Sequence, residues 1–386
     1  MEAVVLGGAG VMGSFVVEHL ADSAGVTRVV AADADPARAA ERLPDHDAIE
    51  TRAVDVTDHE DLLDCLSGYD VAVNCVGPFY EFAPGVVQAA IDAGVDLVDI
   101  CDDYDVTADL LEEFDDVATD AGVTVVVGCG ASPGMTNVLA RRGADRLDAV
   151  DEIAIRVTRG AGAEAGAAIP YHVFHSWLGS IPIHEDGERG RANALQDGEE
   201  VVTFPDPFGQ VTTYHFGHPE TVTLPRVLDV DTVTTKGNLL PGLVRETLLD
   251  FQSLGLLDEE PLDVQGTEIR PLDFAAAHLE RLGDMLAAAG GDDVPSGGAI
   301  VVEVRGTADG RDRSHRYEGT ARMREATGAA ASVGAQLVAD GQVDAPGVNP
   351  PEACVPPDPF VDRLLAEPDF ELWEATREKR TGMDGR

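Results

Sequence analysis

A glycine-rich turn near the start of the chain has the residue types and the spacing of a phosphate-binding turn. It follows an apolar run, opens a stretch with helical spacing, and reads Gly8-Ala9-Gly10-Val11-Met12-Gly13. Gly8 would permit a tight turn, Gly10 would let a diphosphate approach the backbone, and Gly13 would let helix and strand pack closely. The diphosphate would meet the free N–H groups and the positive end of the helix. The turn therefore predicts a dinucleotide site.

An acidic residue stands where such a site meets the ribose of its ligand. Asp33 follows Gly13 by about 20 residues, the separation typical of this site. Its carboxylate can accept hydrogen bonds from ribose hydroxyls and would repel a 2′-phosphate, whereas Arg38 nearby would attract one. We therefore expect NAD or NADP as the cofactor, with NAD slightly favoured.

Two further pairs of residues are expected along the cofactor. Asp55 and Val56 close a third apolar run, where adenine is often bound, although a helix N-cap is an equal alternative for this segment. Gly77 and Pro78 follow the fourth run at its carboxyl end, where the nicotinamide side of the cleft should lie.

Candidate catalytic residues rest on position and residue type. Lys236 is one of only two lysines, so we expect it to handle substrate or protons unless it is a retained surface lysine. Cys101 and Asp102 follow the fifth apolar run and would face the same cleft, and their alternative is a buried thiol and a helix cap. Ser132 precedes a helical pattern and is a candidate substrate contact, with a plain loop residue as the alternative.

Histidines gather in the middle of the chain in two Tyr-His-x-x-His patterns. His172 pairs with His175, and His215 pairs with His218. On a helix, positions i and i+3 face the same way, so the first pair could hold a metal or place a base. No carboxylate or cysteine has a matching ligand spacing, so we expect no metal; we treat His175 as a candidate substrate contact and keep solvated or core histidines as the alternative. Six arginines could each bind a substrate carboxylate, and spacing does not select among them: Arg156, Arg159, Arg189, Arg191, Arg226 and Arg245.

The elements that must position these residues follow from hydrophobic periodicity. Apolar runs alternate with helical stretches and occupy residues 3–6, 28–32, 53–56, 71–76, 96–100 and 123–127. Continuous apolar runs separated by helices indicate a parallel sheet covered on both faces, the α/β, doubly wound architecture. Beyond residue 128 we expect a helix at 134–146, a strand at 152–158, an irregular segment at 159–220, a strand pair at 299–306 and 314–320, and helices at 321–339 and 360–365.

Composition limits the possible functions. The chain has 386 residues, enough for two or three domains, and 71 acidic against 27 basic residues give a formal net charge of -44. A protein surface with this excess of negative charge repels nucleic acid and anionic lipid, so we expect neither as a partner. Because about 1 M salt would screen the self-repulsion, the composition indicates a halophilic source. With no leader pattern and no Cys-x-x-Cys among five cysteines, we expect a cytoplasmic protein with reduced thiols.

The residues together resemble the saccharopine dehydrogenase-like family, the group that includes saccharopine reductase, lysine 6-dehydrogenase and carboxynorspermidine synthase. Besides the glycine turn, the resemblance rests on Val73-Asn74-Cys75-Val76-Gly77-Pro78-Phe79 and on segments 93–99, 121–124, 132–137, 326–328, 335–337, 340–341, 347–348 and 351–352. Ser132 stands where the saccharopine-forming members carry Asp before Pro-Gly, which argues against saccharopine as the substrate.

The resemblance implies an NAD(P)-dependent oxidoreductase that transfers hydride at a C–N bond, acting on CH–NH or CH–NH2 groups of an amino acid or opine-type substrate. It implies a Rossmann domain at 1–130, an α+β substrate and dimerisation domain at 131–320, and a C-terminal segment at 321–386 whose helix returns to the Rossmann domain. It also implies a homodimer.

Two other functions remain open from the residues. Cys129 follows the last apolar run of the first domain, where an aldehyde dehydrogenase places its nucleophile, but the next helix begins too far along to activate the thiol. A non-catalytic NAD-binding scaffold or sensor would carry the same glycine turn.

Overall fold

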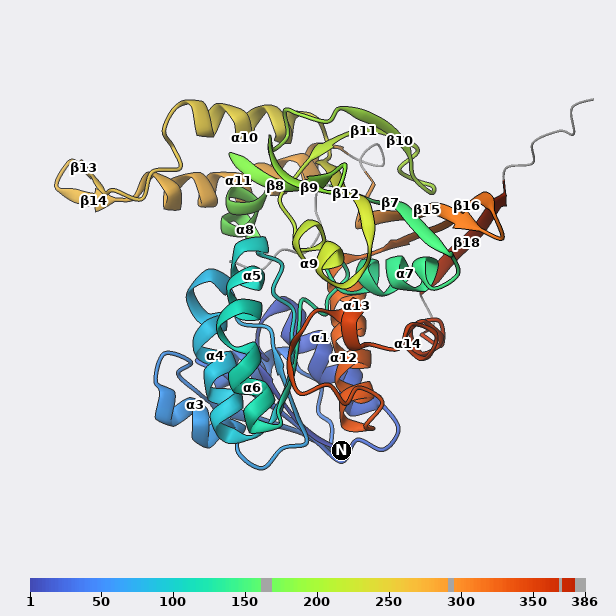
Figure 1. Ribbon diagram of the computed structural model, residues 1–386. Coiled ribbons are helices and arrows are strands. Elements are labelled where there is room, and N and C mark those ends of the chain that lie inside the picture. Colours follow the sequence, from blue (N-terminus) through green and yellow to red (C-terminus); the bar gives the residue numbers. More distant parts are fainter. Residues whose placement is uncertain (161–168, 291–294, 368–369, 379–386) are drawn as a thin grey trace, which may run out of the picture.

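A seven-stranded parallel sheet forms the first part of the computed structural model, which describes residues 1–160, 169–290, 295–367 and 370–378 (Figure 1). The central strands are short runs of Val, Ala and Leu, and they are buried on both faces because helices cover both. In spatial order the strands are β17 (Gly347–Asn349), β6 (Thr124–Val127), β5 (Asp96–Asp99), β4 (Val71–Asn74), β1 (Glu2–Leu6), β2 (Arg28–Asp33) and β3 (Ile49–Ala53).

Two layers of helices enclose this sheet. One layer contains α1 (Val11–Asp22) and α12 (Met323–Ala339), which come from opposite ends of the chain and pack side by side. Their approach is close because α12 is rich in Ala and Gly: a Cβ on Gly328 would lie 2.4 Å from the ring of Phe15. The remaining helices are α2 (Pro36–Arg42), α3 (His59–Leu66), α4 (Phe79–Ala93), α5 (Tyr104–Glu113) and α6 (Asp115–Ala121).

A second, mixed sheet of nine strands forms the rest of the molecule. Its main path runs β10 (Glu200–Thr203), β11 (Gln210–His215), β12 (Val230–Leu239), β7 (Ala149–Arg159), β15 (Gly298–Ala308), β16 (Arg311–Ala321) and β18 (Glu371–Glu378). The antiparallel hairpin β8 (Ser180–Glu185) and β9 (Glu188–Asn193) joins this path through β12.

Helices and one hairpin surround the second sheet. They are α7 (Met135–Ala144), α8 (Ile169–Ser176), α9 (Glu220–Val227), α10 (Leu243–Ser253), α11 (Pro271–Gly290), α13 (Pro351–Cys354), α14 (Pro357–Leu364), and the strands β13 (Leu262–Val264) and β14 (Thr267–Ile269). In Figure 1 the β13–β14 hairpin projects away from the body of the molecule. Among the described residues, no helix is long and apolar enough to cross a membrane.

The C-terminal part of the chain visits both sheets. After β15 and β16, α12 crosses to the first sheet and β17 adds a parallel strand at its edge, next to β6. The chain then returns, and β18 pairs with β16 in the second sheet. The expected fold class, including the returning C-terminal helix, is confirmed, while the boundaries at residues 130 and 320 stay a prediction.

Two sequence expectations about elements are wrong. The third strand is Ile49–Ala53 and not 53–56, because this edge strand is only partly buried and lacks an apolar run. The segment 159–220 is not irregular over its described part, since it holds α8 and the strands β8 to β11. These strands have an exposed face and are short, so their hydrophobic pattern is faint; residues 161–168 lie outside the described part.

Candidate active site

A cavity of about 600 Å³ lies where the carboxyl ends of the first sheet's strands face the second sheet. The loops after β1, β2, β4, β5 and β6 supply one wall, and β7, β15 and β16 supply another. In open α/β sheets, ligands bind in this crevice beyond the carboxyl ends of the strands. The cavity has two chemically different ends.

The glycine turn forms the first end. Gly10 is the N-cap of α1 and no side chain caps the helix, so the first N–H groups of α1 are left for a ligand. A Cβ on Gly13 would lie 2.2 Å from the carbonyl oxygen of Gly7, so only glycine fits there. Gly7, with φ of +74°, takes the left-handed conformation in this turn. The tight turn was expected at Gly8. Gly8 is instead needed for close packing, because a Cβ added there would lie 2.7 Å from the Cα of Ala31.

Charged side chains of both signs stand beside this turn. Asp33 ends β2, and its Oδ2 accepts a hydrogen bond from the backbone N–H of Ala9 at 3.0 Å. Arg38 and Arg42, from α2, donate to the carbonyl oxygen of Ala9 at 3.2 Å and 2.9 Å. Asp33 and both arginines line the cavity. These residues fit the adenosine half of a dinucleotide.

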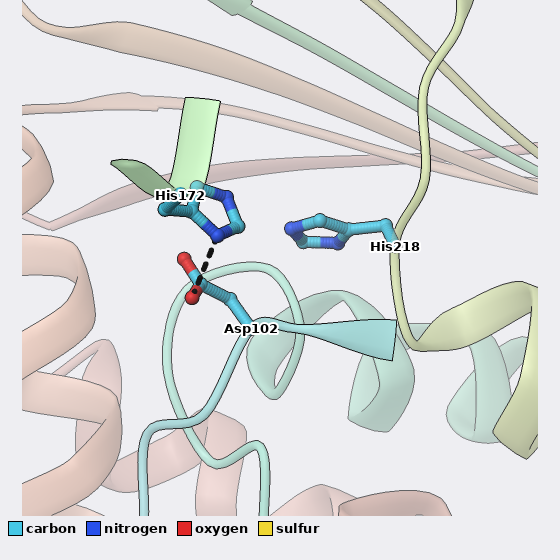
Figure 2. Close-up of side chains that lie close together, drawn as sticks. All are labelled: Asp102, His172 and His218. Carbon is cyan, nitrogen blue, oxygen red and sulfur yellow. Dashed lines mark ion pairs between the residues drawn. The ribbon is translucent and has the colours of Figure 1, made fainter. Parts of the chain in front are cut away.

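The opposite end of the cavity holds a buried histidine between two carboxylates. His172, on α8, lies with Nδ1 3.0 Å from Oδ1 of both Asp102 and Asp103, which follow β5 (Figure 2). Burial alone would lower the pKa of His172, but the two carboxylates raise it to about 10. His172 is therefore a cation at neutral pH, and the same contact holds the pKa of Asp102 below its usual value against the effect of burial.

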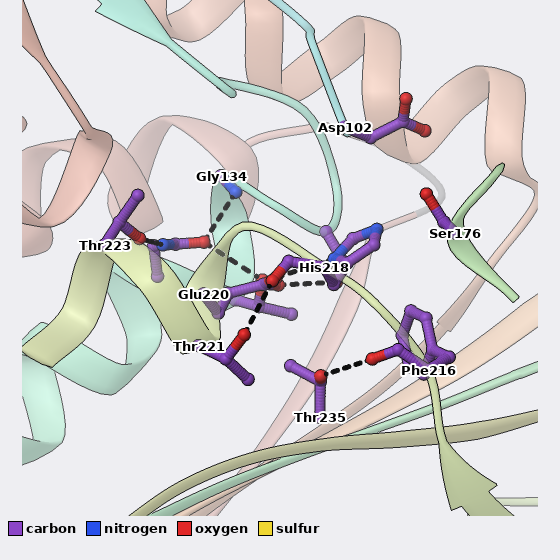
Figure 3. A network of polar contacts seen from close by, with 12 residues as sticks. Asp102, Gly134, Ser176, Phe216, His218, Glu220, Thr221, Thr223 and Thr235 are labelled. Atoms are coloured by element: carbon purple, nitrogen blue, oxygen red, sulfur yellow. Dashed lines mark hydrogen bonds and ion pairs between the residues drawn. The ribbon is translucent and has the colours of Figure 1, made fainter. Parts of the chain in front are cut away.

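A second histidine stands next to the first. His218 precedes α9, is 4 % exposed, and presents its ring 6.2 Å from that of His172, edge to face. Its Nδ1 lies 2.6 Å from Oε2 of Glu220, which is completely buried (Figure 3). The hydroxyls of Ser132 and Thr136 donate to the other oxygen of Glu220 at 2.7 Å and 2.8 Å.

A guanidinium completes this end of the cavity. Arg159 ends β7, lines the cavity, and has no ion-pair partner within the described ranges. Burial lowers its pKa to about 10, an effect that Asp102 partly offsets, so the group is charged at neutral pH. Of the six arginines that spacing could not separate, Arg159 is the one that lines this cavity. A half-buried cation that lines a cavity without an ion-pair partner is suited to bind an anionic group of a ligand.

One set of side chains in this region has the composition of a metal site. Asp102, His172 and His218 each offer one ligand atom, and these atoms lie within 4.8 Å of one another. In the structure, however, Nδ1 of His172 is already shared between two carboxylates. The arrangement is that of groups that hold and pass protons.

The structure brings many of the expected site residues to the cavity. Those that line it are Gly10, Val11, Met12, Asp33, Gly77, Pro78, Asp102 and Ser132. Gly8 and Gly13 lie behind this wall, where their lack of a side chain permits the close packing of the turn. Ser132 lines the cavity, but its hydroxyl is bound to Glu220.

Other expected residues lie elsewhere. Asp55 and Val56 follow β3 in an exposed turn in which Asp55 binds Thr57, and they do not line the cavity. The expected adenine contact at this position rested on the misplaced third strand. His175 does not line the cavity, and its Nε2 pairs with Asp105 at 2.8 Å.

The expected lysine and cysteines are also outside the cavity. Lys236 lies on β12 and pairs with Glu200 at 3.1 Å, on the sheet face opposite to its neighbour Gly237, which packs against the cavity residues Trp177 and Phe216. Cys101 is fully buried, and burial raises the pKa of its thiol well above the usual value. Burial likewise raises the pKa of Cys129 to about 12, so neither thiol has the features of a nucleophile.

Sequence reasoning missed Glu220 and the meeting of two histidines, and it could not separate Arg159 from five other arginines. Both histidine patterns were recognised, but His172 and His218, one from each pattern, meet in the cavity while their partners do not. Only the fold decides this, because α8 and the loop before α9 are distant in sequence. A useful signal was the acid two residues after His218, in Phe216-Gly217-His218-Pro219-Glu220.

Comparisons with known proteins cover nearly the whole chain. The profile of the saccharopine dehydrogenase NADP-binding domain matches residues 3–126, and that of the saccharopine dehydrogenase C-terminal domain matches residues 130–368. A carboxyaminopropylagmatine dehydrogenase from Synechocystis is 22% identical over 94% of this chain and 95% of its own length. The apo saccharopine dehydrogenase (L-Glu forming) from Saccharomyces cerevisiae has the same fold, with a TM-score of 0.68, 18% identity, and coverage of 97% of this chain and 99% of the yeast chain.

Proposed function

The chain belongs to the saccharopine dehydrogenase family, and we propose that it transfers a hydride between NAD(P)(H) and the carbon of a C–N bond in a substrate that also carries a carboxylate. The observation that carries this proposal is the single cavity that joins the glycine turn to Arg159 and the histidine–carboxylate groups. One end suits a dinucleotide, and the other suits a charged, amine-bearing molecule.

The cofactor supplies the redox chemistry, since a bound nicotinamide exchanges a hydride with the substrate carbon. The residues that would hold it are the glycine turn at the diphosphate and Asp33, Arg38 and Arg42 at the adenosine. The loop of Gly77 and Pro78 lies between this end and the polar end of the cavity. The chain's own task is to orient the substrate and to handle its protons.

Arg159 supports a carboxylate in the substrate. Its guanidinium is half-buried, charged and unpaired within the described ranges, so a carboxylate gains charge-assisted hydrogen bonds there without displacing a protein partner. Asp102 and Asp103 line the cavity beside His172, where the substrate nitrogen would lie. An amino-acid or opine-type substrate has both charges.

For the cofactor, we now favour NADP(H), whereas Asp33 and Arg38 weighed together in the sequence slightly favoured NAD. Two guanidiniums, Arg38 and Arg42, converge on the carbonyl of Ala9 next to Asp33, and only Arg38 was considered from the sequence. A 2′-phosphate is a bidentate acceptor that suits arginine. We propose that the protein prefers NADP(H) and that Asp33 leaves NAD(H) usable.

Turnover assays in molar KCl test the proposal. NADP+ and NAD+ are each offered with saccharopine, carboxyaminopropylagmatine and free amino acids, and the reverse reaction with keto-acid and amine pairs, while the absorbance of the reduced nicotinamide is followed. We expect one carboxylate-bearing secondary or primary amine to react, and amines without a carboxylate to fail. Saturable dinucleotide binding without turnover of any of these compounds would instead support a non-catalytic scaffold.

A homodimer is also proposed, with the second copy packed against the projecting β13–β14 hairpin. Leu262, Val264 and Ile269 on this hairpin are exposed, and an isolated two-stranded hairpin is marginally stable in water. Sedimentation of the protein and of a variant with Leu262, Val264 and Ile269 changed to Ser tests the dimer.

We propose the cytoplasm as the location of the protein, because all five cysteines are unpaired.

A further inference from the structure

We propose that His218 is the acid–base group of the reaction and that Glu220 is the positioning residue that orients it. This inference rests on the proposed function and assigns roles within the same cavity. Its basis is a pair of contacts: His218 Nδ1 on Glu220, and the opposite edge of the His218 ring toward the cavity.

The ring of His218 is fixed in one orientation. Nδ1 donates its proton to Glu220 at 2.6 Å, which leaves Nε2 as the free nitrogen of a neutral ring. Within the described residues Nε2 has no hydrogen-bond partner, and Figure 2 shows it turned toward His172 and Asp102. The ring of Phe216 packs on His218 at 4.9 Å, and Trp177 stacks on Phe216 at 4.2 Å. Nε2 is thus held where a substrate nitrogen would lie.

Glu220 is built to remain charged although it is buried. Burial alone would raise its pKa, but His218 and the hydroxyl of Ser132 hold the pKa below its usual value. Thr136 lies in the first turn of α7, so its hydrogen bond ties the carboxylate to this helix. A buried carboxylate in this position fixes the histidine tautomer and stabilises the imidazolium form.

Other titratable groups near the cavity are less suited to this role. His172 carries a proton tightly because Asp102 and Asp103 raise its pKa to about 10, so it acts as a fixed positive charge at neutral pH. Lys236, His175 and Cys101 do not line the cavity. The other charged groups at this end of the cavity are Asp102 and Asp103 after β5 and Arg159 on β7, and Glu220 on α9 contacts His218.

The proposed step balances in protons and electrons. In the oxidative direction Nε2 of His218 takes the proton from the substrate ammonium, which leaves a neutral amine. The C–H hydride, with both bonding electrons, then reduces the oxidised dinucleotide, and the substrate becomes an iminium ion. After Nε2 has released its first proton to solvent, water adds to the iminium carbon as one water proton goes to Nε2. That proton passes to the nitrogen, and the C–N bond breaks as Nε2 takes the remaining hydroxyl proton, which gives a carbonyl compound and an amine.

Kinetics of paired variants test this role. His218→Gln should lower kcat by about 100- to 10,000-fold, the usual contribution of a general base, with little change in KM or NADPH affinity. Added imidazole should restore part of the lost rate. Glu220→Gln should lower kcat less and change the pH profile. The matched control is the pair His175 and Asp105, with a similar contact at 2.8 Å outside the cavity, so His175→Gln and Asp105→Asn should keep the parent kcat.

Outcomes of the two proposals can be told apart. Absence of turnover by the unsubstituted protein counts against the proposed function, whereas a kcat for His218→Gln within threefold of the parent overturns this inference. Should His218→Gln fold poorly, as judged by circular dichroism, Glu220→Gln carries the test: unchanged kcat and pH profile would overturn the role of Glu220. A far-downfield proton resonance, present in the parent and absent in Glu220→Gln, reports the His218–Glu220 contact without any turnover.

Discussion

The two ends of the cavity are built in opposite ways. At the dinucleotide end, the surface for the diphosphate is a single turn between β1 and α1 made of backbone groups and glycines, and Asp33, Arg38 and Arg42 stand beside it. At the reaction end, side chains from the loop after β5, the start of α7, α8 and the segment before α9 meet. One end depends on the absence of side chains, and the other depends on buried charges that stabilise one another.

This difference determines what substitutions do. At the glycine turn, any added atom collides with backbone, and backbone cannot move without shifting the strand and the helix together. At the reaction end, loss of one charge leaves its partner buried and unpaired, so the effect spreads along the network. The predictions below test this contrast from the largest effect to the smallest.

The largest effect is expected at Gly13. In Gly13→Val the new Cβ would lie 2.2 Å from the Gly7 carbonyl oxygen, so α1 must move away from the turn. We expect the affinity for NADPH to fall by at least about 100-fold, equivalent to about 2.7 kcal/mol. Fluorescence titration of bound NADPH measures this. The matched control is Gly85→Ala on α4, where a Cβ meets open space; binding that is equally weak in the control would refute the steric explanation.

At the reaction end, Arg159→Met should act on the substrate and leave the dinucleotide unaffected. Loss of a charge-assisted hydrogen bond costs about 1.5–3 kcal/mol, so we expect KM for a carboxylate-bearing substrate to rise about 10- to 100-fold with NADPH affinity unchanged. Steady-state kinetics on substrates with and without the carboxylate check this. Arg226→Met, at an exposed ion pair with Glu112, is the control and should change neither constant. Equal KM values in both variants would remove Arg159 from the substrate site.

The contrast also explains how much the sequence could predict. The glycine turn, Asp33 and the alternation of strands and helices are local patterns, so the Rossmann sheet and the dinucleotide end follow directly from them. The reaction end is not local: His172 and His218 meet only because α8 and the segment before α9 lie over the carboxyl end of β5. Lys236 looked functional as a rare residue, but the alternation of a strand places it on the opposite sheet face.

A smaller effect is expected at the adenosine. Arg42→Ala removes one of the two guanidiniums beside Asp33, so the ratio of kcat/KM for NADP(H) to that for NAD(H) should fall about tenfold, a cost of about 1.4 kcal/mol. Asp33→Asn should move the same ratio the other way, because a repulsive charge is removed. Should the ratio stay constant in both variants, the proposed NADP(H) preference at this position would be wrong.

The last prediction concerns the outer end of the buried network, where it reaches the C-terminal segment. Glu352, on α13, is buried; its Oε2 accepts from Asn137 at 2.8 Å, and its Oε1 has no hydrogen-bond partner among the residues that the structure describes. Burial raises the pKa of Glu352 to about 7, with a smaller contribution from the charge of Glu220. Because the folded-state pKa is above the unfolded value, ionisation of Glu352 destabilises the fold progressively as pH rises from about 4.5 to 7.

Glu352→Gln should therefore stabilise the protein, by about 1–3 kcal/mol at pH 8 and by close to nothing at pH 4.5, because each pKa unit corresponds to about 1.4 kcal/mol. Urea unfolding at both pH values, in molar KCl, measures the free energy of unfolding. Glu220→Gln is the informative comparison, since its pKa is lowered by its partners and its loss should destabilise the fold at pH 8. A gain for Glu352→Gln that does not depend on pH would show that shape, and not the buried charge, sets the stability of this segment.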